Sequence, residues 1–174
     1  MVQSENILKV ENLYVSYDNV NIVRNISFDL KKQEFLGIVG ESGCGKTTLL
    51  RALMMLKRRG NSMKGRLLFQ GKDLTKFSEE ELRILRGEGI SMIPQNAFAA
   101  MDSTKTISSF FHETVQMHSS QKVARKDSDR LASDLMKKLL LQDTERILKS
   151  YPFELSGGMC QRVMIAAAML NSPK

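Results

Sequence analysis

The chain has 174 residues, 42% hydrophobic and 26% charged, a balance that excludes a largely disordered protein. Its longest purely apolar run, Val163 to Leu170, falls well short of the roughly 20 residues that a membrane-spanning helix needs, and its N-terminus lacks the pattern of a secretory signal. A net charge of +7 favours anionic partners. The basic residues are scattered, and the one short cluster, Lys57 to Arg59, is interpreted as a solvated turn, so no nucleic-acid-binding stripe is indicated.

The first part of the chain has the patterns of β-strands. Residues 7–17 and 21–30 carry partly alternating apolar residues, with turn residues at Asp18 and Asn19 between them. The apolar run 34–39 fits a strand buried on both faces, as in a parallel sheet. Two further strands are predicted at 66–69, before Gly71, and at 90–93, before Pro94.

The first helical pattern begins after Gly45 and stops at residues 60–61. Its apolar positions are Leu49, Leu50, Leu53, Met54 and Leu56. Residues 78–81, Ser-Glu-Glu-Glu, form a capping box for a second helix that ends at Gly87 and Gly89. From about 96 to 153 the pattern is helical, with candidate helices at 107–117 and 123–141. The apolar side of the latter is predicted at Leu131, Leu135, Leu139 and Leu140. This order predicts an α/β core with an inserted α-helical subdomain.

Residues 40–47, GESGCGKT, match the phosphate-binding pattern G-x-x-x-x-G-K-[ST], between an apolar run and a helical pattern. Glycines let backbone N–H groups approach phosphates closely, and the following helix directs its positive end at the same anion. Lys46 would bridge the β- and γ-phosphates, Thr47 would place a hydroxyl on Mg²⁺, and Thr48 could meet the α-phosphate. An ordinary Gly-rich turn is the alternative, and the spacing disfavours a Rossmann dinucleotide site.

A second constellation, Leu155-Ser156-Gly157-Gly158, precedes the helical run that begins at Val163. A serine hydroxyl and open glycine amides at a helix N-terminus could form another anion cradle. Taken alone, this segment is better explained as an ordinary helix N-cap.

Together the two motifs resemble those of ABC (ATP-binding cassette) ATPases. LSGG followed by Gln161 and Arg162 is similar to the family's signature motif, Gln95 to its Q-loop, and Tyr17 to the aromatic that stacks on adenine. Packing at a strand end is the alternative role for Tyr17. The stretch YPFELSGGM is similar to the nickel, dipeptide and oligopeptide importer ATPases. Within that branch, Phe153 and the absence of arginine at position 160 favour nickel or metal-chelate members.

The resemblance implies a P-loop NTPase core with an N-terminal antiparallel β subdomain and an inserted α-helical subdomain, the C-terminal part of the core being absent from the sequence. It implies a β subdomain and P-loop core at 1–95, a helical subdomain at 96–155 and a signature helix at 156–174. Lys46 and Gln95 would be catalytic, and Thr47 and Gln95 would bind Mg²⁺. ATP would contact Tyr17, Gly40, Glu41, Ser42, Gly43, Cys44, Gly45, Lys46, Thr47, Thr48, Ser156, Gly157 and Gly158.

The resemblance also implies partners. ATP would lie between the P-loop of one subunit and the signature of a second, head-to-tail subunit. A separate membrane permease would contact the helical subdomain, with Phe98, Met101, Phe110 and Phe111 as candidates and core packing as their alternative. The protein would be peripheral on the cytoplasmic face of the membrane, and the two cysteines, Cys44 and Cys160, fit that reducing side. No nucleic-acid partner is expected.

One departure from the family pattern is clear. These residues contain no apolar run followed by Asp-Glu, so the general base, the Mg²⁺ carboxylate and the switch histidine are not found. His112 and His118 lie in the helical region and are interpreted as surface or core histidines. A polypeptide of these residues alone is therefore expected not to turn over ATP and to expose residues 35–39. A soluble, non-transport ABC ATPase and a nucleotide-binding fragment without hydrolysis remain the alternative functions.

Overall fold

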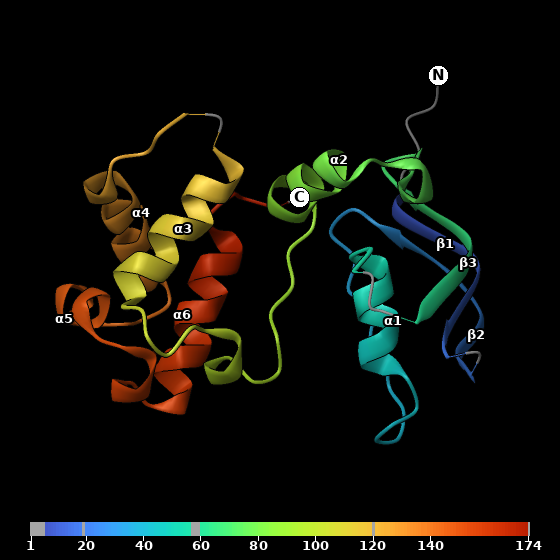
Figure 1. Cartoon of the computed structure of the whole chain (residues 1–174), viewed down its shortest axis with the longest axis horizontal. Coiled ribbons are helices and arrows are strands. Elements are labelled where there is room, and N and C mark those ends of the chain that lie inside the picture. The colour runs from blue at the N-terminus through green and yellow to red at the C-terminus, as the bar shows by residue number, and fades with distance from the viewer. Residues whose placement is uncertain (1–5, 19, 57–59, 120, 174) are drawn as a thin grey trace. The chain divides into compact units, whose positions relative to one another are not determined.

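The computed structural model describes the chain except for residues 1–5, 19, 57–59, 120 and 174. The chain forms two compact units, Met1–Leu82 and Arg83–Lys174, each of which is described by itself (Figure 1). The domain boundary expected at residue 95 lies within the second unit. The basic cluster at 57–59 and the turn residue Asn19 lie outside the described residues.

The first unit is built on a four-stranded antiparallel sheet with the order β2-β1-β3-β4. Its strands are β1 (Asn6–Tyr17), β2 (Val20–Lys31), β3 (Asn61–Phe69) and β4 (Lys72–Asp73). The strands predicted at 7–17, 21–30 and 66–69 are confirmed. Strand β3 begins earlier than expected because its residues from Asn61 onward pair with the end of β1 at Tyr17. The buried face of the sheet includes Val10, Leu13, Val15 and Leu67.

Three neighbouring strands carry left-handed residues at one level of this sheet. Asn12 has φ 47°, Asn25 has φ 50° and Gly65 has φ 111°, and the register of β1 with β3 shifts between Glu11 and Tyr14. A Cβ atom on Gly65 would lie 2.5 Å from the Asn12 carbonyl oxygen, so only glycine fits there. Bulges of this kind increase the local twist of a sheet.

Two predicted strands are not formed. Residues 34–39 and 90–93 have no strand structure, and the side chains of Phe35 and Val39 are 100% and 96% exposed. A strand requires a hydrogen-bonded neighbour. Neither segment has one in the described part of the chain, where the sheet ends at β2 and β4. The prediction that 34–39 is buried on both faces was therefore wrong for this structure, whereas the expected exposure of Phe35 is confirmed.

Helix α1 (Lys46–Leu53) follows the segment 34–45 and buries Leu49, Ala52 and Leu53, with contacts to β1 and β2. It ends sooner than the apolar pattern suggested, and Leu50 is on its exposed side. The unit is completed by the short helix η1 (Leu74–Lys76) and the start of α2 (Glu79–Ile84). The predicted capping box of α2 is confirmed, since Ser78 N–H donates to Glu81 Oε2 at 2.7 Å and Glu81 N–H donates to Ser78 Oγ at 3.3 Å.

The second unit is helical. A π-helical turn, η2 (Leu85–Gly89), continues α2, and the remaining elements are η3 (Phe98–Ala100), α3 (Ile107–His118), α4 (Arg125–Lys138), α5 (Thr144–Lys149), η4 (Pro152–Glu154) and α6 (Gly157–Met169). The helix predicted at 107–117 is confirmed. The one predicted at 123–141 is shorter, and Asp143, with φ 53°, precedes a separate helix, α5. Among the described residues, no helix combines the length and apolar character needed to cross a bilayer.

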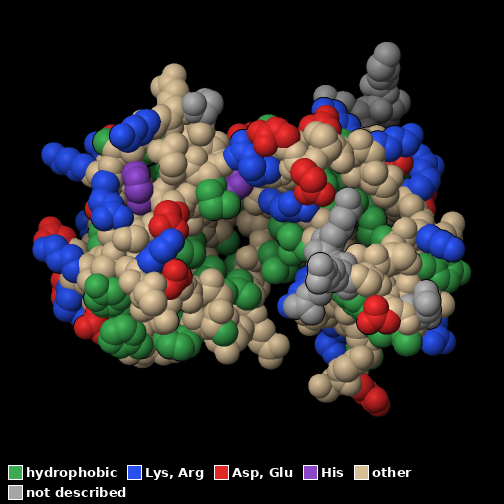
Figure 2. Space-filling model, in the orientation of Figure 1, with side chains coloured by type: hydrophobic (Ala, Val, Ile, Leu, Met, Phe, Trp, Pro, Cys, Tyr) green, Lys and Arg blue, Asp and Glu red, His purple; other side chains and the backbone are tan. Residues whose placement is uncertain are grey.

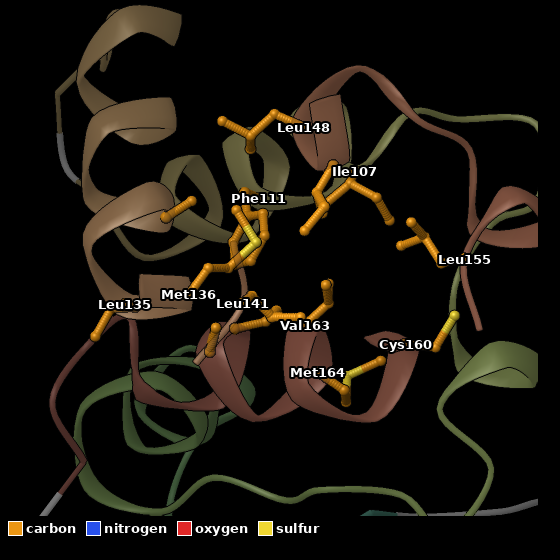
Figure 3. Packing of buried hydrophobic residues seen from close by; sticks show 14 of the residues in the cluster. Ile107, Phe111, Leu135, Met136, Leu141, Leu148, Leu155, Cys160, Val163 and Met164 are labelled. Atoms are coloured by element: carbon orange, nitrogen blue, oxygen red, sulfur yellow. The ribbon is translucent and has the colours of Figure 1, made fainter. Parts of the chain in front are cut away.

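A single hydrophobic cluster holds these helices together (Figure 3). Ile107, Phe111, Met136, Ile147 and Val163, from four different helices, are completely buried in it. The predicted apolar side of α4 was wrong in part because Leu131 and Leu140 are exposed while the small residue Ala132 and Met136 face the cluster. Met101 and Phe111 also belong to the cluster, so they cannot serve as surface contacts for a permease. Phe98 is 47% exposed and Phe110 is half-buried.

Candidate functional site

The loop from Gly40 to Gly45 wraps around the side chain of Lys46. The Lys46 ammonium donates hydrogen bonds to the carbonyl oxygens of Gly40 at 2.8 Å and Glu41 at 2.5 Å, and it lies 3.7 Å from Cys44 Sγ. A Cβ atom on Gly40 would lie 2.7 Å from the same sulfur. The loop is therefore folded tightly around the Lys46 ammonium.

The backbone of this loop is set by glycine conformations. Gly43 has φ 83° and Gly45 has φ 103°, values that L side chains rarely adopt. Gly45 also packs on β2, since a Cβ atom there would lie 3.1 Å from Ile22 Cγ2. Helix α1 has no side-chain cap and no acidic residue in its first turn. Its N–H groups and positive dipole end thus face the loop, which is the arrangement that binds an anion.

Several other residues of the first unit are predicted to contact ATP or Mg²⁺. Thr47 is exposed and Thr48 is half-buried in the first turn of α1, and Glu41, Ser42 and Cys44 are exposed. Tyr17 is half-buried at the end of β1, where it pairs with Val20 and Asn61. The described residues contain no group of three or more His, Cys, Asp or Glu that could hold a metal. A hydroxyl such as that of Thr47 suits Mg²⁺, which usually keeps waters and binds together with phosphates.

The predicted signature segment is the start of α6. Ser156 is its N-cap, and its Oγ accepts a hydrogen bond from Met159 N–H at 3.3 Å. Gly157 and Gly158 are exposed, and a Cβ atom on either would meet nothing within 4 Å. Neither glycine is therefore required by local packing, and both leave the helix N-terminus open to a ligand. The structure thus confirms the N-cap at Ser156, and the anion cradle stays a prediction.

The turn before Ser156 is anchored by contacts that the sequence did not predict. Cys160 Sγ donates to the Pro152 carbonyl at 3.4 Å, and burial raises the pKa of this thiol, which stays protonated. Tyr151 N–H donates to Glu154 Oε2 at 2.7 Å. The Tyr151 and Phe153 rings stack with centroids 5.5 Å apart. A signal for this turn was available in the glutamate three residues after Tyr151, the spacing of a capping box.

Gln95 and the histidines lie in the second unit. Gln95 is exposed at a bend just before η3, which begins where Ala99 N–H donates to Asn96 Oδ1 at 3.0 Å. His112 Nδ1 lies 2.9 Å from Ser128 Oγ and is half-buried, in agreement with its interpretation as a packing residue. Each unit therefore presents one candidate anion cradle, around Lys46 in the first and at Ser156 in the second.

Comparison with known proteins gives consistent matches. The family described as "ABC transporter" matches residues 23–174. The dipeptide transport ATP-binding protein DppD of Bacillus subtilis is 39% identical over 175 residues, covering 97% of this chain and 52% of that protein. The metal-staphylopine import system ATP-binding protein CntD of Staphylococcus aureus is 37% identical over 153 residues, covering 88% of this chain and 56% of that protein. The chain spans about half the length of these curated relatives.

Solved structures show the same fold. The dimeric ATP-binding cassette MJ0796, in a post-hydrolysis state bound to ADP and Pi, matches with a TM-score of 0.82 at 24% identity, covering 95% of this chain and 70% of that one. The protein cbiO1 of Clostridium perfringens, part of the transporter complex cbiONQ, matches with a TM-score of 0.75 at 24% identity over 98% of this chain and 64% of its own. At this identity the likeness shows the fold alone.

Proposed function

Since the chain belongs to the ABC transporter family, we propose that it is the ATP-binding subunit of an importer that takes up peptides, nickel or other metal chelates through a separate membrane permease. ATP binding and hydrolysis would drive this uptake. The observation that carries the proposal is the glycine-lined loop closed around the Lys46 ammonium at the open N-terminus of α1. The dipeptide transport of DppD and the metal-staphylopine import of CntD support the two substrate classes.

In this proposal each residue of the first cradle has a distinct task. Backbone N–H groups from Gly40 to Thr48 donate to phosphate oxygens, and the Lys46 ammonium turns from the Gly40 and Glu41 carbonyls to the β- and γ-phosphates. Tyr17 stacks on the adenine, and Thr47 and Gln95 offer oxygen atoms to Mg²⁺. When bound, Mg²⁺ neutralises charge on the phosphates. Phosphoryl transfer depends largely on such positioning and charge stabilisation, so Lys46 and Gln95 are the proposed catalytic residues.

The second cradle would act on ATP held by another subunit. Ser156, Gly157 and Gly158 are exposed at the start of α6, where no packing contact explains the two glycines. Approach of a phosphate to a helix N-terminus requires such open backbone. The dimer of the cassette MJ0796 with ADP and Pi is a precedent for a paired arrangement. We propose a head-to-tail pair in which each ATP lies between one Lys46 loop and the partner's Ser156 segment.

The permease would contact the second unit from the cytoplasmic face of the membrane. Of the four candidate side chains, Phe98 is the exposed one and Phe110 is half-buried. Recovery of a membrane permease with the tagged protein would support the importer, whereas recovery of ribosomes or DNA would favour the alternative of a soluble ABC ATPase in translation or repair.

A second function, nucleotide binding without hydrolysis, is favoured for a polypeptide of these 174 residues by the lack of an apolar run followed by Asp-Glu. We expect the purified chain to release no phosphate from ATP above the background of a Lys46→Ala control, because no carboxylate is identified to activate water or support Mg²⁺. Steady-state phosphate release measures this. Turnover near 1 s⁻¹ that is lost in the control would contradict it and point to another acid, such as Glu41 or Asp102.

The paired arrangement predicts complementation between two defective chains. We expect ATP with Mg²⁺ to promote dimers of the parent chain, and neither Lys46→Ala nor Gly158→Asp to form them alone. A mixture should form dimers, because one of its two composite sites contains neither defect. Sedimentation velocity with and without ATP measures the dimer fraction.

Ser103→Asp is the matched control because it adds the same charge to the second unit at an exposed position outside the Ser156 segment. It should preserve both folding and dimers. If the mixture stays monomeric while Ser103→Asp dimerises, the signature segment does not act on a partner's nucleotide.

A further inference from the structure

The C-terminal end of α3 packs against η2 within the second unit. The Arg83 guanidinium, at the end of α2, donates a hydrogen bond to the Met117 carbonyl. This carbonyl belongs to the last turn of α3, where carbonyl groups lack partners inside the helix. The contact therefore joins α3 to the helical turn that continues α2.

The next residue of α3 lies directly on the backbone of η2. Gly87 is buried in this turn, and a Cβ atom added to it would overlap the imidazole ring of His118 at Nδ1, Cε1 and Cγ. Any side chain at position 87 would thus displace the ring. His118 Nδ1 is buried and has no hydrogen-bond partner in the described part of the chain. The ring is therefore held by close packing on Gly87 rather than by a hydrogen bond at Nδ1.

The segment fixed by this contact leads to Gln95. A cavity of about 170 Å³ is lined by His118 of α3, by Gly87 of η2 and by Ser91 and Met92 of the segment beyond η2. Residues 90–93 form no strand, so no sheet ladder sets their course in this structure. The packing of His118 on Gly87 lies at the cavity that Ser91 and Met92 also line.

We propose that His118 is a positioning residue whose neutral ring, packed on Gly87, fixes η2 and thereby the path of residues 90–95 to Gln95. The proposal rests on the proposed function only for the role of Gln95 at the nucleotide. The packing itself is testable without any nucleotide.

Protonation of the ring opposes this packing. The charged groups around it are Arg83 of α2 and Arg86 and Glu88 of η2. Burial, and then the charge of Arg83, lowers the pKa of His118 below its ordinary value of 6.5, with Glu88 acting weakly in the other direction. The unfolded ring therefore takes up a proton first as the pH falls. The packed form is fully favoured above about pH 6.5 and loses stability from there down to the lowered pKa.

Hydrogen exchange of the backbone amides in residues 88–95 tests the proposal on the 174-residue chain. We expect His118→Ala and Gly87→Ala each to speed exchange there about tenfold at pH 7.5, one variant by removing the ring and the other by displacing it. In the His118→Ala background, Gly87→Ala should add little, because the methyl group then has space. His112→Gln, which changes the other histidine of α3, should leave exchange in 88–95 at the parent rate.

The pH profile separates positioning from a general loss of structure. After correction for intrinsic rates, exchange in 88–95 should rise in the parent and in His112→Gln between pH 7.5 and 5.5, but not in His118→Gln. Equal exchange of parent and His118→Ala, or a pH effect that survives in His118→Gln, would overturn the proposal. If the alanine variants are unfolded, the parent still tests the proposal. An exchange rate in 88–95 that does not change in the parent between pH 7.5 and 5.5 would overturn it. Failure of the proposed function would appear separately, as ATP binding that does not depend on Lys46.

Discussion

Replacing Lys46 with alanine is expected to weaken ATP binding by at least tenfold, or about 1.4 kcal/mol. The reason is the position of the Lys46 ammonium, which donates to the Gly40 and Glu41 carbonyls inside the loop and is the only side-chain cation of residues 40–48. Charge-assisted contacts to phosphate are among the strongest that a side chain makes. Calorimetric titration of ATP in the presence of Mg²⁺ measures the loss.

Lys64→Ala is the matched control for Lys46→Ala. It removes the same charge from the same unit, but from an exposed position on β3. It should leave the affinity unchanged, which separates a local contact from the effect of net charge. Equal affinity of Lys46→Ala and the parent would remove the assignment of residues 40–47 as a phosphate-binding loop.

Replacing Phe111 with alanine is expected to lower the free energy of unfolding by about 3–5 kcal/mol. Phe111 is completely buried in the cluster between α3, α4 and α6, and its ring packs against Phe110 with centroids 5.8 Å apart. Because small proteins are stable by only about 5–15 kcal/mol, the variant could lose most of its folded population. Urea unfolding followed by the helical circular dichroism signal measures the change.

Phe98→Ala provides the comparison for Phe111→Ala. Phe98 is 47% exposed in η3, so its removal should cost less than about 1 kcal/mol. A similar loss for both variants would mean that Phe111 is not at the centre of the cluster. A small loss for Phe98→Ala also makes it a usable variant for testing the proposed permease contact.

The sequence was sufficient where a pattern is local. The capping box at Ser78, the glycine loop before α1 and the N-cap at Ser156 all appear as predicted, because each depends on residues three to six positions apart. Strands β1 and β2 also follow from alternation and from a short turn between them. The family motifs were recognisable for the same reason.

The sequence was insufficient where the structure depends on distant partners. The apolar run 34–39 has the composition of a buried strand, but its side chains are exposed because no described strand lies beside it. The apolar face of α4 was predicted wrongly because Ala132 is completely buried in the cluster, although its small side chain is only a weak hydrophobic signal in the sequence. The contact of His118 with Gly87 joins residues 31 positions apart and has no local signal.

The aromatic stack beside α6 has a spectroscopic consequence. The sequence contains no tryptophan, so near-ultraviolet absorption and emission come mainly from Tyr14, Tyr17 and Tyr151, with a weaker contribution from the eight phenylalanines. Tyr151 stacks on Phe153 with an interplanar angle of 11°, one turn before Ser156. Substituting Phe153 with tryptophan would therefore place a single tryptophan at the second cradle. Its red-shifted absorption and emission would allow it to be excited separately from the other aromatic rings of the chain. Quenching of that tryptophan would report whatever approaches Ser156 without a label attached to the protein. Figure 2 shows hydrophobic side chains, in green, at the surface of the second unit. Phe153 is 63% exposed, so a ring at position 153 is open to a soluble quencher.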